Sequence, residues 1–245
     1  MVAGVIADPV LTHRVEEGHP IPLLLWRLAE PALAISSAVL GGGIGPCRWL
    51  VNATVPMSYD RDDPAAHLRE MAAGLRLRGP GVGLLTGVDA ADVVAGQDGG
   101  VRLWATVGLG APVQAAAAPG AVAPHAGTVN IVAWVPQRLS DGALVNAVAT
   151  VTEAKTQAIR DLGLAATGTA TDAVAVLCPP AGPVAAYAGP RSQWGARLAR
   201  AVHRAVRDGG EVNLAGVPSW SDRQDAARRS PPSHREAEGR GSILD

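Results

Sequence analysis

The chain has 245 residues, of which 48% are hydrophobic, and a formal net charge of −1. This length fits one large domain, and the near-neutral charge gives no electrostatic basis for binding nucleic acid or a membrane surface. The sequence contains no Phe and only two Tyr, so Ala, Val and Leu must fill the core with six Trp as the large side chains.

The N-terminus predicts no export signal, because it carries acids and prolines rather than a basic region and a long apolar run. No uncharged apolar run of about 18 residues predicts a membrane helix. The two cysteines, Cys47 and Cys178, lie far apart and indicate neither a zinc site nor a disulfide framework. We therefore expect a cytoplasmic protein.

The first half of the chain alternates short apolar, β-branched runs with Gly and Pro, which is typical of strands and turns. Pro64 fits the first turn of a helix with Asp62 or Asp63 as its N-cap. The predicted elements are strands over 33–39 and 48–55, joined by a glycine-rich hairpin link over 41–45, a helix over 64–78, and strands over 82–86 and 101–109.

The second half contains the longest predicted helix, from about Asp141 to Leu162, with Ser140 or Asp141 as N-cap and Gly163 after its last turn. Residues 112–126 form a low-complexity Ala/Pro loop. The other predicted elements are strands over 128–135 and 172–178 and a helix over 193–207.

The order β-β-α-β-β-β-α-β-α favours an α+β fold in which helices cover a mixed β-sheet. We predict one domain over 20–217, between a loose lead-in over 1–19 and a disordered tail over 218–245 that is poor in apolar residues. A weak internal duplication is also indicated, since Asn52, a helix and 86–89 resemble Asn130, a helix and 169–172.

Lys155 is the only lysine among 21 basic residues, and it interrupts the apolar stripe of the longest helix. The stripe follows steps of four and three residues, which place its members on one helix face. A structural role, with the ammonium leaving the core or pairing with a buried carboxylate, is one interpretation. The other is a catalytic wall, where a desolvated ammonium stabilises an oxyanion. The stripe consists of Leu144, Val148, Val151, Lys155, Ala158 and Leu162.

Three ordered blocks then resemble the adenosylcobinamide amidohydrolase family. They are residues 127–132, residues 152–156 around Lys155, and the Gly/Thr-rich block 166–172 that ends at Asp172. Upstream, Asn52, Tyr59, the Asp63–Pro64 pair and residues 81–86 are similar to the N-terminal half of the same family. The resemblance covers roughly residues 30–210.

The resemblance implies hydrolysis of the amide that joins the aminopropanol arm to the corrin ring, giving adenosylcobyric acid for cobalamin salvage. The partner is then a small-molecule corrinoid substrate, and no separate cofactor is expected. The substrate-binding candidates are Asn52, Tyr59, Thr86, Thr128, Asn130, Gly168, Thr169, Thr171 and Trp194.

Amide hydrolysis needs a base or nucleophile and donors for the oxyanion. We predict Glu153 or Asp172 as general base for water, with Lys155 and the Asn130 amide or backbone N–H groups holding the oxyanion. A threonine nucleophile, Thr169 or Thr171, is the competing scheme, and the carboxylates could equally be structural.

The six histidines are scattered and support no zinc site. His67 and His203 are expected on helix surfaces, and His125 in a surface loop that precedes the 127–132 block. Two other functions stay open: a non-catalytic corrinoid-binding protein, and a hydrolase that cleaves itself to free an N-terminal threonine.

Overall fold

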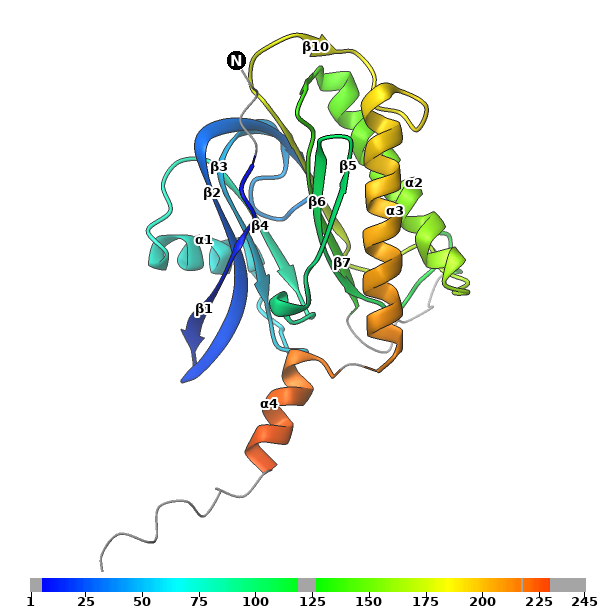
Figure 1. The fold of residues 1–245 in the computed structure, drawn as a ribbon. Helices are drawn as coiled ribbons and strands as arrows, with labels where there is room; N and C mark the ends of the chain where they lie inside the picture. The colour runs from blue at the N-terminus through cyan, green and yellow to red at the C-terminus, as the bar shows by residue number, and fades with distance from the viewer. Residues whose placement is uncertain (1–5, 119–126, 217, 230–245) are drawn as a thin grey trace, which may run out of the picture.

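The computed structural model describes residues 6–118, 127–216 and 218–229, and eight of its strands form one mixed sheet (Figure 1). The sheet order is β4-β3-β2-β9-β7-β6-β5, and β1 pairs with β2 outside this path. The strands are β1 Val10–Glu16, β2 His19–Ser36, β3 Gly43–Thr54, β4 Gly81–Thr86, β5 Val94–Asp98, β6 Val101–Gly108, β7 Thr128–Trp134 and β9 Ala173–Cys178. A separate parallel pair joins β8 Arg138–Leu139 to β10 Val184–Ala185.

The sheet is folded over on itself at β2 and β3. β2 pairs with β3 along most of its length, with a register shift between Arg27 and Ala32. Only the last part of β2, from Leu33 to Ser36, pairs with β9. The first half of β2 therefore belongs to one half-sheet, with β3 and β4, and the second half leads into the other, with β9, β7, β6 and β5.

Apolar side chains fill the three spaces between four layers. The helix α1 (Pro64–Gly74) packs on the first half-sheet, and the helices α2 (Asp141–Asp161) and α3 (Gln193–Leu214) pack on the second (Figure 1). Between the half-sheets, Trp26 and Trp104 meet edge to face with centroids 5.7 Å apart. Tryptophans thus supply the large aromatic contacts that a core without Phe requires.

The predicted helices are confirmed, with two changes of length. Asp63 caps α1 and Ser140 caps α2, each accepting a backbone N–H of the first turn. α1 ends at Gly74, four residues before the predicted end, and Arg76 then adopts a positive φ of 55°. α3 runs seven residues further than predicted, to Leu214.

The sequence prediction is wrong for parts of both termini. Residues Val10–Glu16 form β1 rather than a loose lead-in, and they pair antiparallel with the start of β2. Residues Trp220–Arg229 form α4, within the segment predicted as a disordered tail. Strand β5 was not predicted either, although it pairs with β6. Residues 119–126 of the Ala/Pro loop, which include His125, and residues 230–245 lie outside the described part of the chain.

Two β–α–β units meet at one end of the folded sheet. In the first, β3 and β4 are parallel and α1 connects them; in the second, β7 and β9 are parallel and α2 connects them. The ends of β3 and β4 and the beginnings of β7 and β9 lie at this end, which we call the open end. Asn52 of β3 and Asn130 of β7 occupy it together, in hydrogen-bond contact.

Candidate functional site

A cavity of about 420 Å³ occupies the open end, and we call it the central cavity. It is bounded by the end of β4, the starts of β7 and β9, the turn after β2, and the segment after β3. Five predicted site residues line it: Tyr59, Thr86, Thr128, Thr171 and Asp172. The structure therefore brings together residues that are up to 113 positions apart in the sequence.

Lys155 is not itself a lining residue of this cavity, but it forms an ion pair with Asp172, which is one. The α2 stripe is confirmed: Leu144, Val151 and Ala158 are buried on the same helix face, and Lys155 is 7% exposed among them. Its ammonium donates to Oδ2 of Asp172, which directly precedes β9. The lysine therefore stays in the core, where a charge needs a partner to offset the loss of water.

Asp172 accepts four hydrogen bonds. Oδ1 accepts from Val129 N at 2.9 Å and Thr169 Oγ1 at 2.5 Å, and Oδ2 accepts from Thr169 N at 3.1 Å and from Lys155. A carboxylate offers about four acceptor positions, so these donors saturate it. This geometry favours Asp172 as an anchor that fixes Lys155 and the loop before β9, over Asp172 as a free base.

Gly168 is required for the close approach of this loop to the ion pair. A Cβ atom built there would lie 2.6 Å from Nζ of Lys155 and closer still to the Asp172 carboxylate. Thr169, which follows, is buried, and its single hydroxyl hydrogen is shared between Asp172 and the Gly127 carbonyl, which lies 2.7 Å from Oγ1. Both residues thus shape the site from behind the central cavity.

Two threonine hydroxyls meet on the cavity wall. Oγ1 of Thr128 and Oγ1 of Thr171 are 2.8 Å apart, and Thr171 also donates to the Gly127 carbonyl at 3.1 Å. Thr171 is exposed, whereas Thr169 is buried. Of the two predicted nucleophile candidates, Thr171 is the one that a substrate can reach.

A buried amide pair lies below the cavity. Asn130 donates from Nδ2 to Oδ1 of Asn52 at 2.9 Å and to the Leu85 carbonyl at 2.8 Å, and Asn52 donates to Thr106 at 3.0 Å. Oδ1 of Asn130 is buried with no partner among the described residues. These bonds join the two half-sheets across their open end.

Two predicted residues lie away from this site. Glu153 is exposed and lines a different cavity, between α2 and α3, so it does not meet Lys155 or Asp172. Trp194 lies near the start of α3, where the guanidinium carbon of Arg197 lies over its ring, 4.9 Å from the ring centroid. The α3 residues nearest the open end begin at Gly209, which is 15 residues or about 22 Å along the helix.

His67, expected on a helix surface, is instead buried next to the open end. It is 3% exposed; its Nε2 is 2.6 Å from Oε1 of Glu16 and its Nδ1 is 3.1 Å from the Tyr59 hydroxyl. His203, the other helical histidine, is half-buried and pairs with Asp161 at 2.7 Å. Ser37, in the cavity wall, was not predicted as a site residue; its hydroxyl accepts from Val174 N at 3.0 Å.

Further space adjoins the central cavity. A cavity of about 490 Å³, here the β1 cavity, shares Pro56, Met57 and Tyr59 with it and is also lined by Glu16 and His67. A third, of about 610 Å³, shares Met57, Gly87 and Thr128 and reaches the end of α3. The three cavities together make the empty space at the open end much larger than one side chain.

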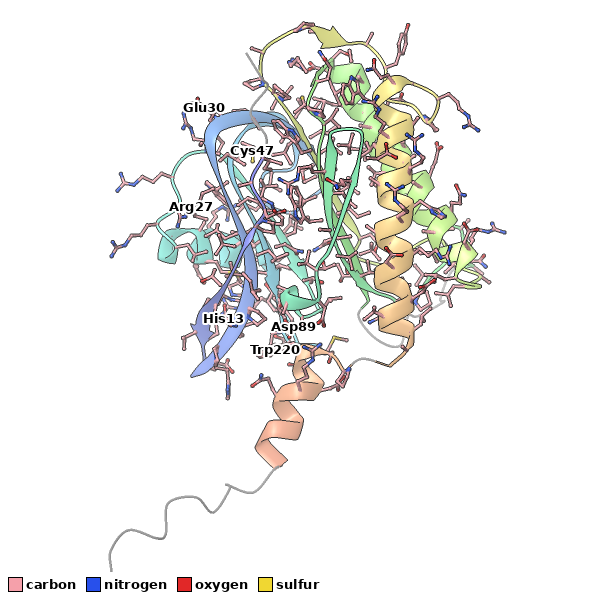
Figure 2. All side chains as sticks on the ribbon, in the orientation of Figure 1. His13, Arg27, Glu30, Cys47, Asp89 and Trp220 are labelled. Carbon is pink, nitrogen blue, oxygen red and sulfur yellow. The ribbon has the colours of Figure 1, made fainter. Side chains whose placement is uncertain are left out.

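α4 is attached at this end by charged contacts. Arg223 contacts Asp89 at 3.0 Å and Asp92 at 2.5 Å, and Ser221 accepts from Met57 N at 3.0 Å. Figure 2 shows Asp89 and Trp220 where α4 meets the sheets. No group of three or more potential metal-ligating side chains occurs among the described residues, and no helix there is long and apolar enough to span a membrane.

Comparison with known proteins gives concordant matches. The sequence model of the adenosylcobinamide amidohydrolase family matches residues 8–216. An adenosylcobinamide amidohydrolase of Methanosarcina mazei is 30% identical over 185 residues, covering 72% of this chain and 89% of that protein. One from Halobacterium salinarum is 35% identical over 190 residues, covering 74% and 81%.

A solved structure is also similar at a low level. A beta-aminopeptidase of Burkholderia sp. aligns with a TM-score of 0.41 and 14% identity, covering 90% of this chain and 87% of that one. A likeness this weak supports no conclusion about chemistry.

Proposed function

This chain belongs to the adenosylcobinamide amidohydrolase family, and on that premise we propose that it hydrolyses the amide between the aminopropanol arm and the corrin ring of adenosylcobinamide. The products are adenosylcobyric acid and aminopropanol. The first product returns to cobalamin assembly, so the role is corrinoid salvage.

The observation that supports this proposal most strongly is the content of the central cavity. Thr128 and Thr171, whose hydroxyls are in contact, line it, and so does Asp172, whose carboxylate pairs with the only lysine of the chain. The family match spans all of these residues. A volume of about 420 Å³ suits the amide-bearing arm, and the adjoining cavities offer room for part of the macrocycle.

In this proposal Lys155 stabilises the transition state. Attack on the amide carbonyl places negative charge on its oxygen, and a fixed cation in a site with little water stabilises that charge strongly. Asp172 accepts one ammonium hydrogen and thereby sets the direction of the other two. The ion pair thus positions the charge before the substrate arrives.

The hydroxyls of Thr128 and Thr171 would hold the attacking water. Thr171 donates to the Gly127 carbonyl and Thr128 to Thr171, so each oxygen can accept a hydrogen bond from water, and both residues line the same cavity. A threonine nucleophile would instead leave Thr171 acylated during turnover. Intact-mass measurement on the working enzyme separates the two schemes, since only the second adds the mass of the corrinoid acyl group.

The proposal is tested by incubating the full chain with adenosylcobinamide and measuring both products by mass spectrometry. We expect equimolar adenosylcobyric acid and aminopropanol, with the 24.9 kDa chain intact. A Lys155→Arg variant, which keeps the charge but not the compact ammonium, should lose at least about tenfold in kcat. Tight binding without release of aminopropanol would instead indicate a corrinoid-binding protein.

A further inference from the structure

His67 is another buried ionisable residue at the open end, and it forms a continuous hydrogen-bonded chain with Glu16 and Tyr59. Glu16 Oε1 is 2.6 Å from Nε2 of His67, and the Tyr59 hydroxyl is 3.1 Å from Nδ1. The three residues come from β1, α1 and the segment between β3 and α1. Burying polar groups lowers stability unless their hydrogen bonds are made inside the protein. Both ring nitrogens of His67 have such a partner, so the fold accommodates this buried histidine specifically.

The direction of the chain follows from its chemistry. Burial acts to raise the pKa of Glu16, but hydrogen bonds from Arg14 and His67 outweigh it and hold that pKa below its ordinary value. The carboxylate is thus ionised near neutral pH and can only accept, so Nε2 of His67 carries a proton. In the neutral imidazole Nδ1 is then an acceptor, and it receives the Tyr59 O–H.

Tyr59 places the end of this chain at the junction of two cavities. It lines both the central cavity, with Thr171 and Asp172, and the β1 cavity, with Glu16 and His67. Burial raises the pKa of Tyr59, so the phenol is protonated in the resting protein. The charged groups that act on it are Arg14, Glu16, Arg61 and Asp63.

We propose that Glu16, His67 and Tyr59 form a proton relay that serves amide hydrolysis in the central cavity, with Tyr59 as the catalytic residue and His67 and Glu16 as positioning residues. The relay rests on the proposed function. It supplies a general base for the reaction. Asp172 is not free for this role because it accepts four hydrogen bonds, and Glu153 lines a different cavity.

Protons and electrons balance without another reactant. As water attacks the carbonyl carbon, its proton passes to the Tyr59 oxygen while the Tyr59 proton moves to Nδ1 of His67, and the carbonyl electron pair moves to oxygen. The imidazolium is stabilised by the Glu16 carboxylate. As the carbon–nitrogen bond breaks, the electron pair on the oxyanion re-forms the carbonyl and the pair of the broken bond stays on nitrogen. Tyr59 donates a proton to that nitrogen, and Nδ1 returns its proton to Tyr59.

The decisive variant is Tyr59→Phe, which removes the hydroxyl and keeps the ring. General acid–base catalysis contributes about 10²–10⁴-fold, so we expect kcat on adenosylcobinamide to fall by about 10²-fold or more with KM within about threefold. The matched control is Tyr187→Phe, which alters the other tyrosine of the chain, 75% exposed, and should keep wild-type kcat. Tyr187→Phe should melt like the wild type, whereas Tyr59→Phe should stay folded with a lower midpoint, since Nδ1 of the buried His67 loses its hydrogen-bond donor.

A second substrate distinguishes proton donation from a structural role. In an amide of adenosylcobyric acid with a less basic amine, the departing nitrogen needs less protonation, so Tyr59→Phe should cost at least tenfold less than on adenosylcobinamide. His67→Gln should lower kcat like Tyr59→Phe, and the double variant should be no slower than the worse single one. His203→Gln is the control for histidine loss.

The outcomes separate the relay from the function. If the wild type releases no aminopropanol, the proposed function fails. If the wild type is active and Tyr59→Phe keeps more than a third of its kcat, or loses equally on both amides, the relay is wrong and the hydrolysis stands.

Discussion

The two β–α–β units that meet at the open end carry the same framework but different charges. Each has a buried asparagine on its first strand, Asn52 or Asn130, and each helix buries one ionisable side chain. α1 buries His67 against Glu16, and α2 buries Lys155 against Asp172. The first pair contains an imidazole, whose two nitrogens can donate and accept hydrogen bonds, whereas the second joins an ammonium to a carboxylate.

This difference suggests a division of labour. A group that moves protons must titrate readily, and a group that stabilises an oxyanion must stay charged and fixed. The carboxylates also differ in exposure: the side chain of Asp172 is 11% exposed, against 25% for Glu16. Variants of the two pairs test this contrast.

The largest effect should come from removing the charge of α2. Lys155→Met leaves the Asp172 carboxylate buried without its cation, so it should cost about 3–5 kcal/mol of unfolding free energy. His67→Leu, the corresponding change in α1, should cost less, about 1–3 kcal/mol, because Glu16 keeps Arg14 and more water. Urea denaturation of both variants measures the difference; equal losses would remove the contrast.

Crowding the α2 pair without removing it should have a smaller effect. In Gly168→Ala the added Cβ overlaps both Lys155 and Asp172, so the loop must shift, at a cost of about 1–3 kcal/mol. Gly142→Ala is the control, because nothing lies within 4 Å of a Cβ there. Thermal melts should show a lower midpoint for the first variant only, and a matching midpoint for both would contradict the tight approach described here.

The link between the two units should be worth about as much as one hydrogen bond. Asn52→Ala, Asn130→Ala and the double variant form a cycle whose coupling energy should be about 0.5–1.5 kcal/mol. Denaturation of the four proteins gives this value. A coupling near zero would mean that the amides are satisfied independently.

The smallest effect should be the pH dependence of the α1 pair. The pKa of Glu16 is lowered in the folded protein, so its contribution to stability is complete above its ordinary pKa of 4.5 and is lost as the pH falls through the folded value. The stability difference between wild type and Glu16→Gln should therefore shrink below pH 4.5. A difference that stays constant from pH 7 into this range would contradict the pairing.

How far the sequence predicts this site differs between the two units. Much of the α2 unit can be predicted from the sequence. The periodicity of Leu144, Val151 and Ala158 places Lys155 on the buried face of the helix, and Ser140 marks the helix start. Its partner Asp172 lies only 17 residues away, within a Gly/Thr-rich block. Local periodicity thus predicts where Lys155 lies, but the sequence indicates Asp172 only as a candidate general base and does not identify it as the partner of Lys155.

The contact between α1 and β1 cannot be predicted in this way. Glu16 lies 51 residues before His67, in a strand whose apolar residues Val10, Leu11 and Val15 are exposed, so no buried stripe marks it. The sequence signal that could have predicted β1 is Gly18, a residue typical of hairpin turns. In the structure Glu17 and Gly18 join β1 to β2 with positive φ angles of 51° and 79°. Glu16 reaches His67 only because β1 pairs with β2 and β2 with β3, and this strand pairing cannot be predicted from a single sequence.

The most direct test of hydrolysis at this site is turnover of adenosylcobinamide in water enriched in oxygen-18. We predict one heavy oxygen in the new carboxylate of adenosylcobyric acid and none in the released aminopropanol, with Lys155→Arg forming the same labelled product at least about tenfold more slowly. Absence of the acid product, or a product without the label, would contradict amide hydrolysis by this protein.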